Sequence, residues 1–173
     1  GIYTTAICID DANRKWIGTQ NNGVFLLSED GKETIHHFTE ENSPLLSNYI
    51  QTIAINSSTG SVFFGTSLGL IEYGGDATEP EKSLSESNIE VYPNPVNPDF
   101  DGPVTIKGMS DKCTVRIVSA SGSLIYQGYS NGGTFTWNVT DRNGNRVSSG
   151  IYHAIITDLN NSKSTSVSIT VIR

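Results

Sequence analysis

Short apolar stretches separated by polar turns run along the whole chain. Some alternate strictly with polar residues, as Cys113, Val115 and Ile117 do, whereas Val24–Leu27 is continuously apolar. A period of two is typical of half-buried strands, and a short continuous run is typical of a strand packed on both faces. No stretch shows the helical period. The pattern therefore predicts an all-β fold made of many short strands.

The first half of the chain contains an internal repeat. Three blocks recur at spacings of 46, 47 and 46 residues, as the pairs Ile7 and Ile53, Trp16 and Phe63, and Gly23 and Gly69. Blades of β-propellers span about 40–50 residues. Each copy has the pattern strand, polar turn, strand ending in Gly-Thr, hairpin and third strand, and a fourth strand is predicted at Thr34–Phe38. Residues 1–75 are therefore predicted to form about two blades.

The blade motif consists of Trp16, Gly18, Thr19, Gly23, Gly65, Thr66 and Gly69. Together with the preceding Ile9-Asp10, it resembles the two-component-regulator propeller repeat. The second copy departs from the family pattern, since Asn56 replaces the Asp and Phe63-Phe64 replaces Trp-Ile. Propellers close with roughly four to eight blades. Two blades therefore need either further blades or another copy of the chain, and the second option implies self-association through open blade edges.

A β-sandwich is predicted for the second half. Residues 76–88 are small, acidic and polar, and we interpret them as a linker. After them, about seven short strands recur at spacings of about 8–12 residues, between turn sequences such as Asn143-Gly144. The predicted fold is thus a partial β-propeller over residues 1–75, a linker, and an immunoglobulin-like β-sandwich over residues 89–173.

A second motif runs through the sandwich: Tyr92, Pro93, Asn94, Pro95, Gly122, Trp137, Gly144, Gly150 and Tyr152. Its order resembles the C-terminal sorting domain of type IX secretion cargo. The two prolines lock φ and lack the N–H donor, so the first strand is expected to end there at a sheet edge. The glycines are expected in turns that a Cβ would forbid, and Trp137 in the core between the sheets. The last strand departs from the family, because Arg173 is its only basic residue where a Lys is usual.

Propeller blades followed by a sorting-type domain also resemble the arrangement of PorZ-like proteins. That resemblance implies a surface component of the type IX system whose C-terminal domain is retained and binds anionic lipopolysaccharide. It also implies protein partners in the secretion or envelope machinery. The implied location is the cell surface, outer membrane or periplasm of a Bacteroidetes-type bacterium.

The charge excludes some partners. The chain has 11 Lys and Arg against 18 Asp and Glu, a formal net charge of −7 and a pI of about 4.8. A field of this sign repels phosphate backbones, so nucleic acid is not expected as a partner. No apolar run approaches the roughly 20 residues of a membrane-spanning helix. No signal peptide is visible, and because Gly1 leads directly into a strand pattern, we expect the natural chain to begin upstream.

One short acidic segment is a calcium candidate. Asn97, Asp99 and Asp101 place oxygen ligands at alternate positions, with Gly102 sixth. The twelfth position is Gly108, where a calcium loop carries a bidentate Glu. A solvated acidic turn is therefore the preferred interpretation.

Other reactive side chains are scattered. His36 and His37 are adjacent on one predicted strand and so face opposite sides, and His153 stands alone. Cys8 and Cys113 fall in different predicted domains, and two buried free thiols are favoured over an interdomain disulfide. No nucleophile, zinc or phosphate-loop motif is present. No catalytic or cofactor-binding residue is therefore predicted.

The leading hypothesis is a non-enzymatic cell-surface or envelope accessory protein. Its blades would contact partners, and its sandwich would serve in export, anchoring or lipopolysaccharide binding. The alternative is a fragment of a periplasmic glycan-sensing propeller from a hybrid two-component system. A third interpretation, a carbohydrate-active enzyme, requires a catalytic domain outside this chain.

Overall fold

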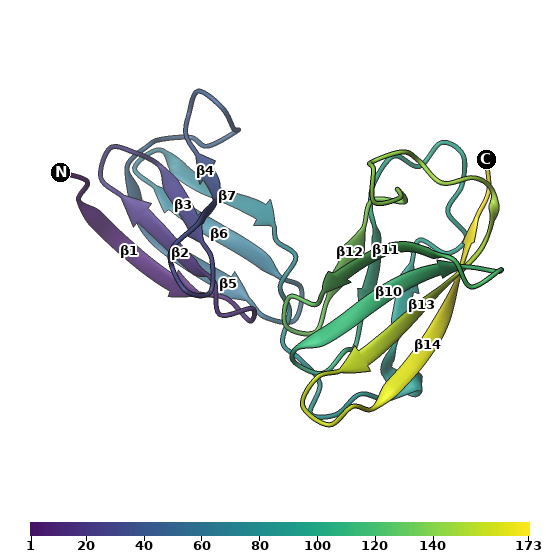
Figure 1. Ribbon diagram of the computed structural model, residues 1–173. Coiled ribbons are helices and arrows are strands. Elements are labelled where there is room, and N and C mark those ends of the chain that lie inside the picture. Colours follow the sequence, from purple (N-terminus) through teal and green to yellow (C-terminus); the bar gives the residue numbers. More distant parts are fainter. The chain divides into compact units, whose positions relative to one another are not determined.

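The computed structural model describes residues 1–173, and its strands confirm the all-β prediction. The chain divides into two compact units, residues 1–79 and 80–173 (Figure 1). Each unit has its own hydrophobic core. The one helical element is a 3-10 turn, η1, at Glu86–Asn88.

The first unit consists of two antiparallel sheets whose strands follow the order of the chain. The first sheet contains β1 (Thr4–Ile9), β2 (Lys15–Thr19), β3 (Val24–Leu27) and β4 (Thr34–Phe38). The second contains β5 (Ile50–Asn56), β6 (Ser61–Thr66) and β7 (Gly69–Gly74). Consecutive up-and-down strands are the architecture of propeller blades. The partial propeller predicted from the repeat is confirmed, with four strands in the first blade and three in the second.

The core of the first unit lies between the two blades. It is formed by Trp16, Val24 and Leu26 of the first blade, Ile50, Val62 and Phe64 of the second, and Leu45 between them. Trp16 is fully buried, and its ring lies 5.5 Å from those of Phe64 and Tyr73. Gly18 permits this packing, because a Cβ there would lie 2.6 Å from Cγ2 of Ile50 in the next blade. A side chain at this position of the motif would therefore collide with the next blade.

The other face of the first blade is only partly covered. Val24 and Leu26 of β3 are buried in the core, whereas Phe25 and Leu27, which point the other way, are half-buried. Phe25 stacks on His37 with ring centroids 4.0 Å apart, and Ile7 in the same cross-strand row is 65% exposed. The prediction that β3 packs on both faces therefore holds fully for one face only.

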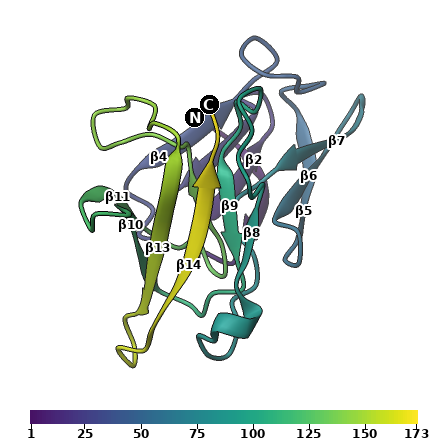
Figure 2. The ribbon, with the colours of Figure 1, turned by 90° about the vertical axis from the view of Figure 1, so that its right-hand side faces the viewer.

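The second unit is a sandwich of two antiparallel sheets. The larger sheet, in the order β11-β10-β13-β14, contains β10 (Cys113–Ser119), β11 (Leu124–Tyr129), β13 (Gly150–Asp158) and β14 (Ser164–Val171). The smaller sheet, in the order β12-β9-β8, contains β8 (Glu90–Tyr92), β9 (Val104–Lys107) and β12 (Phe135–Trp137). Figure 2 shows β13 and β14 of the larger sheet together with β8 and β9 of the smaller one. Alternate residues of both sheets fill one core, as a sandwich requires.

The segment interpreted as a linker contains the boundary between the two units but is not free chain. The division falls between Glu79 and Pro80. Asp76 forms an ion pair with Arg14 of the first unit. Leu84 is fully buried in the core of the second unit, where Glu81 also bridges to Ser110. A single buried leucine in a polar stretch leaves no periodicity in the sequence, so this anchoring was not visible there.

Candidate functional site

The Tyr92–Pro95 segment of the sorting motif closes the outer edge of the last strand. Asn94 Nδ2 donates to the carbonyl oxygen of Ser168 at 2.9 Å, and the backbone N–H of Thr170 donates to Asn94 Oδ1 at 3.0 Å. The side-chain amide thus occupies the place of a peptide group on a neighbouring strand. Two residues on, Val96 forms a parallel bridge to Val171. The motif therefore connects the end of β8 in one sheet to β14 in the other.

The two prolines limit the backbone N–H groups that this segment can offer to a neighbouring strand. β8 ends at Tyr92, directly before Pro93, and it is an edge strand of its sheet. The peptide bonds preceding Pro93 and Pro95 are both cis. Because neither proline has an N–H, the chain leaves its own sheet, and Asn94 pairs with β14 through its side chain before the backbone of Val96 pairs with the same strand. The ammonium nitrogen of Lys107 lies over the Tyr92 ring, 5.5 Å from the ring centroid.

The aromatic residues of the motif form the centre of the sandwich. Trp137 is fully buried, and its ring lies 5.5 Å from that of Tyr152. Both polar ends are paired: Trp137 Nε1 donates to the carbonyl of Thr140, and the Tyr152 hydroxyl donates to the carbonyl of Ser148, each at 2.8 Å. The Tyr152 bond reaches a backbone carbonyl a few residues upstream, like the tyrosine corner of immunoglobulin-like domains. Burial raises the pKa of Tyr152 and so favours its protonated, donating form.

The glycines of the sorting motif do not share one role. Gly122 and Gly144 have φ values of +83° and +82°, in hairpin turns. Asp141 shapes the second turn, since its Oδ1 accepts the N–H groups of Asn143 and Asn145. The expectation that Gly150 lies in a turn that requires glycine is wrong. Its φ is not positive, and a Cβ there would meet only the Tyr152 ring, at 3.8 Å.

The blade motif forms the same hairpin twice. In the first blade, Thr19 Oγ1 donates to the carbonyl of Gly23 at 2.8 Å and accepts the N–H of Asn22. In the second, Thr66 Oγ1 donates to the carbonyl of Gly69 at 2.9 Å and accepts the N–H of Leu68. The threonine hydroxyl therefore closes the loop between the second and third strands of each blade. Gly65 lies beside Thr52, whose Cγ2 would be 2.5 Å from an added Cβ.

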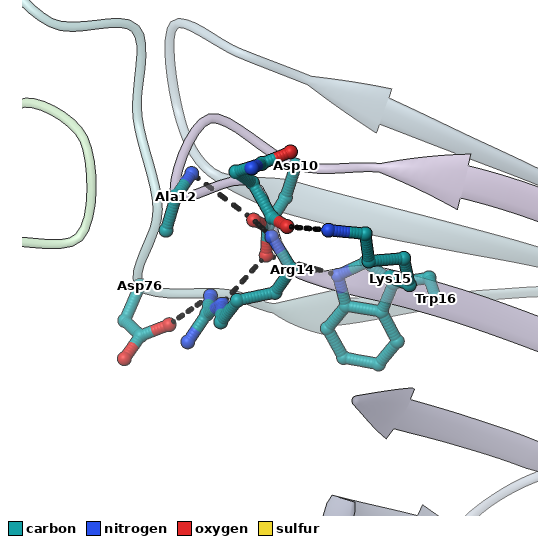
Figure 3. Close-up of polar contacts among 7 residues, drawn as sticks. Asp10, Ala12, Arg14, Lys15, Trp16 and Asp76 are labelled. Carbon is teal, nitrogen blue, oxygen red and sulfur yellow. Dashed lines mark hydrogen bonds and ion pairs between the residues drawn. The ribbon is translucent and has the colours of Figure 1, made fainter. Parts of the chain in front are cut away.

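A cluster at the first turn, buried except for one carboxylate, was not predicted from the sequence, and we name it the blade clasp. It consists of Asp10, Arg14, Trp16 and Asp76 (Figure 3). Asp10 Oδ2 accepts hydrogen bonds from Arg14 Nε at 2.8 Å and Trp16 Nε1 at 3.3 Å, while Oδ1 accepts the N–H groups of Ala12 and Arg14. Arg14 Nη2 reaches Asp76 at 2.7 Å, 62 residues along the chain. The clasp therefore ties the first turn to the end of the second blade.

The electrostatics of the clasp favour a permanently charged arginine. Burial of the guanidinium lowers its pKa, but the hydrogen bond and negative charge of Asp76, together with Asp10, outweigh burial and raise the pKa of Arg14. In the second blade, Asn56 occupies the position of Asp10, and its Oδ1 accepts only from Ser58. The loss of the Asp in the second copy therefore accompanies the loss of its arginine and tryptophan partners.

The outward side of the larger sandwich sheet, which we name the hydroxyl face, is rich in hydroxyl groups. Its register places Gln127, Arg116, Ile155 and Ser166 in one cross-strand row, and Tyr129, Thr114, Thr157 and Ser164 in the next. His153 and Ser168 continue the face, with His153 Nδ1 3.2 Å from the hydroxyl of Ser168. Arg116 is exposed and forms no ion pair within the chain. The face therefore presents donors, an aromatic ring and one unpaired cation to solvent.

The scattered acids and histidines do not form a metal centre. No group of three or more His, Cys, Asp or Glu side chains is placed to hold an ion. In the calcium candidate, Asp101 pairs with Arg146 Nη1 at 3.1 Å, and Asn97 and Asp99 are exposed. His36 stacks near Phe38 and His37 on Phe25. The two histidines therefore do not meet.

Both cysteines are free thiols, Cys8 half-buried and Cys113 fully buried. Burial raises the pKa of Cys113 and so disfavours its thiolate. The chain contains no helix long and apolar enough to cross a membrane.

Charge is divided unequally between the two units. Residues 1–79 carry three Lys and Arg against ten Asp and Glu, whereas residues 80–173 carry eight of each. The whole net charge of −7 therefore resides in the blades. The sandwich is neutral overall.

The fold and the motifs together define a partial β-propeller followed by a β-sandwich. Residues 90–170 match the family model of the secretion system C-terminal sorting domain. The match covers most of the second unit, residues 80–173. A comparison with curated proteins gave no match.

The solved structure of PorZ from Porphyromonas gingivalis, described as an essential surface component of its type IX secretion system, is similar over 99% of this chain. The two are 39% identical with a TM-score of 0.65, and the chain spans 23% of the PorZ chain. The extracellular domain of the hybrid two-component system BT4673 from B. thetaiotaomicron gives 13% identity and a TM-score of 0.35, over 100% of this chain and 26% of that one. Dimeric latent PorU from Porphyromonas gingivalis is 14% identical with a TM-score of 0.37. The match covers 65% of this chain and 12% of the PorU chain. The last two likenesses are too distant to bear on function.

Proposed function

We propose that this chain is part of a non-catalytic surface component of the type IX secretion system. The observation that carries the proposal is the 39% identity to PorZ over 99% of the chain, with blades and sorting domain in the same order. The proposal assigns no reaction to the chain, since Cys113 is buried with a raised pKa and the acids lie apart. The sandwich serves as the address or anchor, and the blades contact protein partners.

The hydroxyl face is the part of the sandwich best suited to a glycolipid. Hydroxyl donors and the exposed Tyr129 ring are groups that bind sugars, and the unpaired Arg116 is suited to phosphate or carboxylate. The sandwich is neutral overall, whereas the blades would repel an anionic surface. We therefore propose a lipopolysaccharide site on β10, β11, β13 and β14 rather than on the blades.

Surface localisation tests the general proposal. The chain, fused behind a periplasmic export signal and produced in a bacterium with a type IX system, is expected to become sensitive to protease added to intact cells. In an isogenic strain lacking the secretion channel it should remain protected. Equal protection in both strains would contradict the proposal.

Binding to isolated lipopolysaccharide tests the finer assignment. Arg116→Ser is expected to weaken binding severalfold, with a smaller effect at high salt, because surface charge interactions are screened. Arg142→Ser, which removes an exposed arginine from the turn at Asp141, is the matched control. Equal affinities of the two variants would remove the hydroxyl face from the proposal without affecting the surface role.

A further inference from the structure

The second blade holds the start of the segment that the sequence suggests is a linker. Asp76 belongs to the blade clasp (Figure 3). The next residue, Ala77, is 2% exposed and lies against the β5–β6 turn, where a Cβ on Gly60 would be 2.9 Å from the Ala77 carbonyl oxygen. The N–H of Glu79 then donates to the carbonyl of Ser57 in the same turn, at 2.8 Å. The chain is therefore bound to the first unit as far as the amide of Glu79.

The second unit binds the chain again two residues later. The N–H of Glu81 donates to the carbonyl of Met109 at 2.9 Å, and Glu81 forms a parallel bridge to Ser110. Ser110 is itself held in place, because its hydroxyl donates to the buried carboxylate of Asp158 at 2.7 Å. Leu84 then enters the sandwich core, where it is fully buried. From the amide of Glu81 onward, the chain is therefore bound to the second unit.

Only Glu79 and Pro80 contribute rotatable backbone bonds between these two amides. The pyrrolidine ring holds φ of Pro80 at about −65°. Its Cδ also disfavours the helical conformation at the preceding residue and so keeps Glu79 extended. The one wide rotation left is ψ of Pro80. A free polar linker over residues 76–88 would instead keep two soft torsions at nearly every residue.

We propose that Glu79-Pro80 is a stiff hinge that restricts the reorientation of the sandwich relative to the blades. The anchors on each side of the hinge lie within their own unit, so the restriction comes from the chain itself and requires no contact between the units. A partner bound to the blades and a ligand bound to the sandwich would therefore be held in a restricted mutual orientation. This inference does not depend on the proposed role in secretion.

Nitrogen-15 NMR relaxation of the whole chain tests the proposal, because it gives a rotational correlation time for each unit. We expect one common correlation time, and backbone order in residues 76–84 as high as in the strands. Inserting Gly-Ser-Gly-Ser between Glu79 and Pro80 should shorten the correlation times of both units. Pro80→Gly should act in the same direction with a smaller effect, because it frees φ at the hinge. Ser83→Gly is the matched control, since it places glycine at an exposed position between the anchors at Glu81 and Leu84, and it should leave the correlation times unchanged.

Three results would overturn the proposal. Separate, short correlation times in the unmodified chain would show that the units reorient freely. Hydrogen exchange at the amide of Glu79 or Glu81 as fast as in an unfolded peptide would show that an anchor is missing. If the chain with the insertion keeps the common correlation time, contacts between the units restrict them and the hinge does not.

Discussion

Replacing Asn94 with alanine should destabilise the sandwich more than its surface position suggests. The substitution removes both side-chain hydrogen bonds between Asn94 and β14, from Nδ2 to the carbonyl of Ser168 and from the N–H of Thr170 to Oδ1. A hydrogen bond contributes about 0.5–1.5 kcal/mol net. Because Asn94 is exposed, water replaces part of the loss, and we expect a cost of about 1–2 kcal/mol.

Thermal unfolding followed by circular dichroism measures this cost. In a domain of this size, about 1 kcal/mol lowers Tm by roughly 4–8 °C. Hydrogen exchange gives a second and more local measure, since the amide of Thr170 should exchange faster in Asn94→Ala while the amides of β10 do not change. Asn94→Asp keeps the acceptor oxygen but loses the donor to Ser168, so it should also be destabilised.

Asn138→Ala is the matched control, because Asn138 is exposed and its side chain forms no hydrogen bond in the chain. Its effect should stay within about 0.5 kcal/mol, as for most surface substitutions. If Asn94→Ala unfolds at the same temperature as Asn138→Ala, the edge-closing role of the motif is refuted.

Three further predictions concern other parts of the molecule. Asp10→Ala leaves Arg14 paired with Asp76 alone and strands the indole N–H of Trp16, so urea unfolding of the blades should show a loss of about 1–3 kcal/mol, and Asn56→Ala should cost less. Thr66→Val removes the hydroxyl that bonds Gly69 and Leu68, so the same measurement should show a loss of about 1–2 kcal/mol, whereas an unchanged midpoint would contradict the hairpin role. The hydrogen bond from Ser110 lowers the pKa of Asp158 below its usual value. The stabilisation that the Asp158 carboxylate contributes is therefore fully present above about pH 4 and is lost as pH falls through the folded pKa. In Asp158→Asn, the free energy of unfolding should therefore decrease less steeply as pH is lowered.

Local patterns were sufficient to predict the strands from the sequence. The alternation of Cys113, Val115 and Ile117 is reproduced in β10, where all three are fully buried. The repeat spacing predicted the two blades, because the first three strands and the turns between them recur in each blade. These features depend on neighbours along the chain, which a sequence displays directly.

The polar anchors were not predicted because their partners lie far away in the sequence. Asn94 bonds to backbone atoms 74 and 76 residues away, and Arg14 to Asp76, 62 residues away. A hydrogen bond to a backbone atom does not depend on the residue type, so the sequence does not indicate where it forms. Asp76 is one of many acidic residues, and nothing in the sequence marks it as the partner of Arg14. For the same reason, the residues of the sorting motif were identified as turns and edges, but the strand that Asn94 covers was not.

The unequal division of charge has a consequence for how the chain approaches an anionic bacterial surface. The blades, with all of the net charge, are repelled once they come within about 8 Å, the screening length at physiological salt, while the neutral sandwich is not. The sandwich would therefore approach such a surface more readily than the blades would. Raising the ionic strength should abolish this difference without altering either fold.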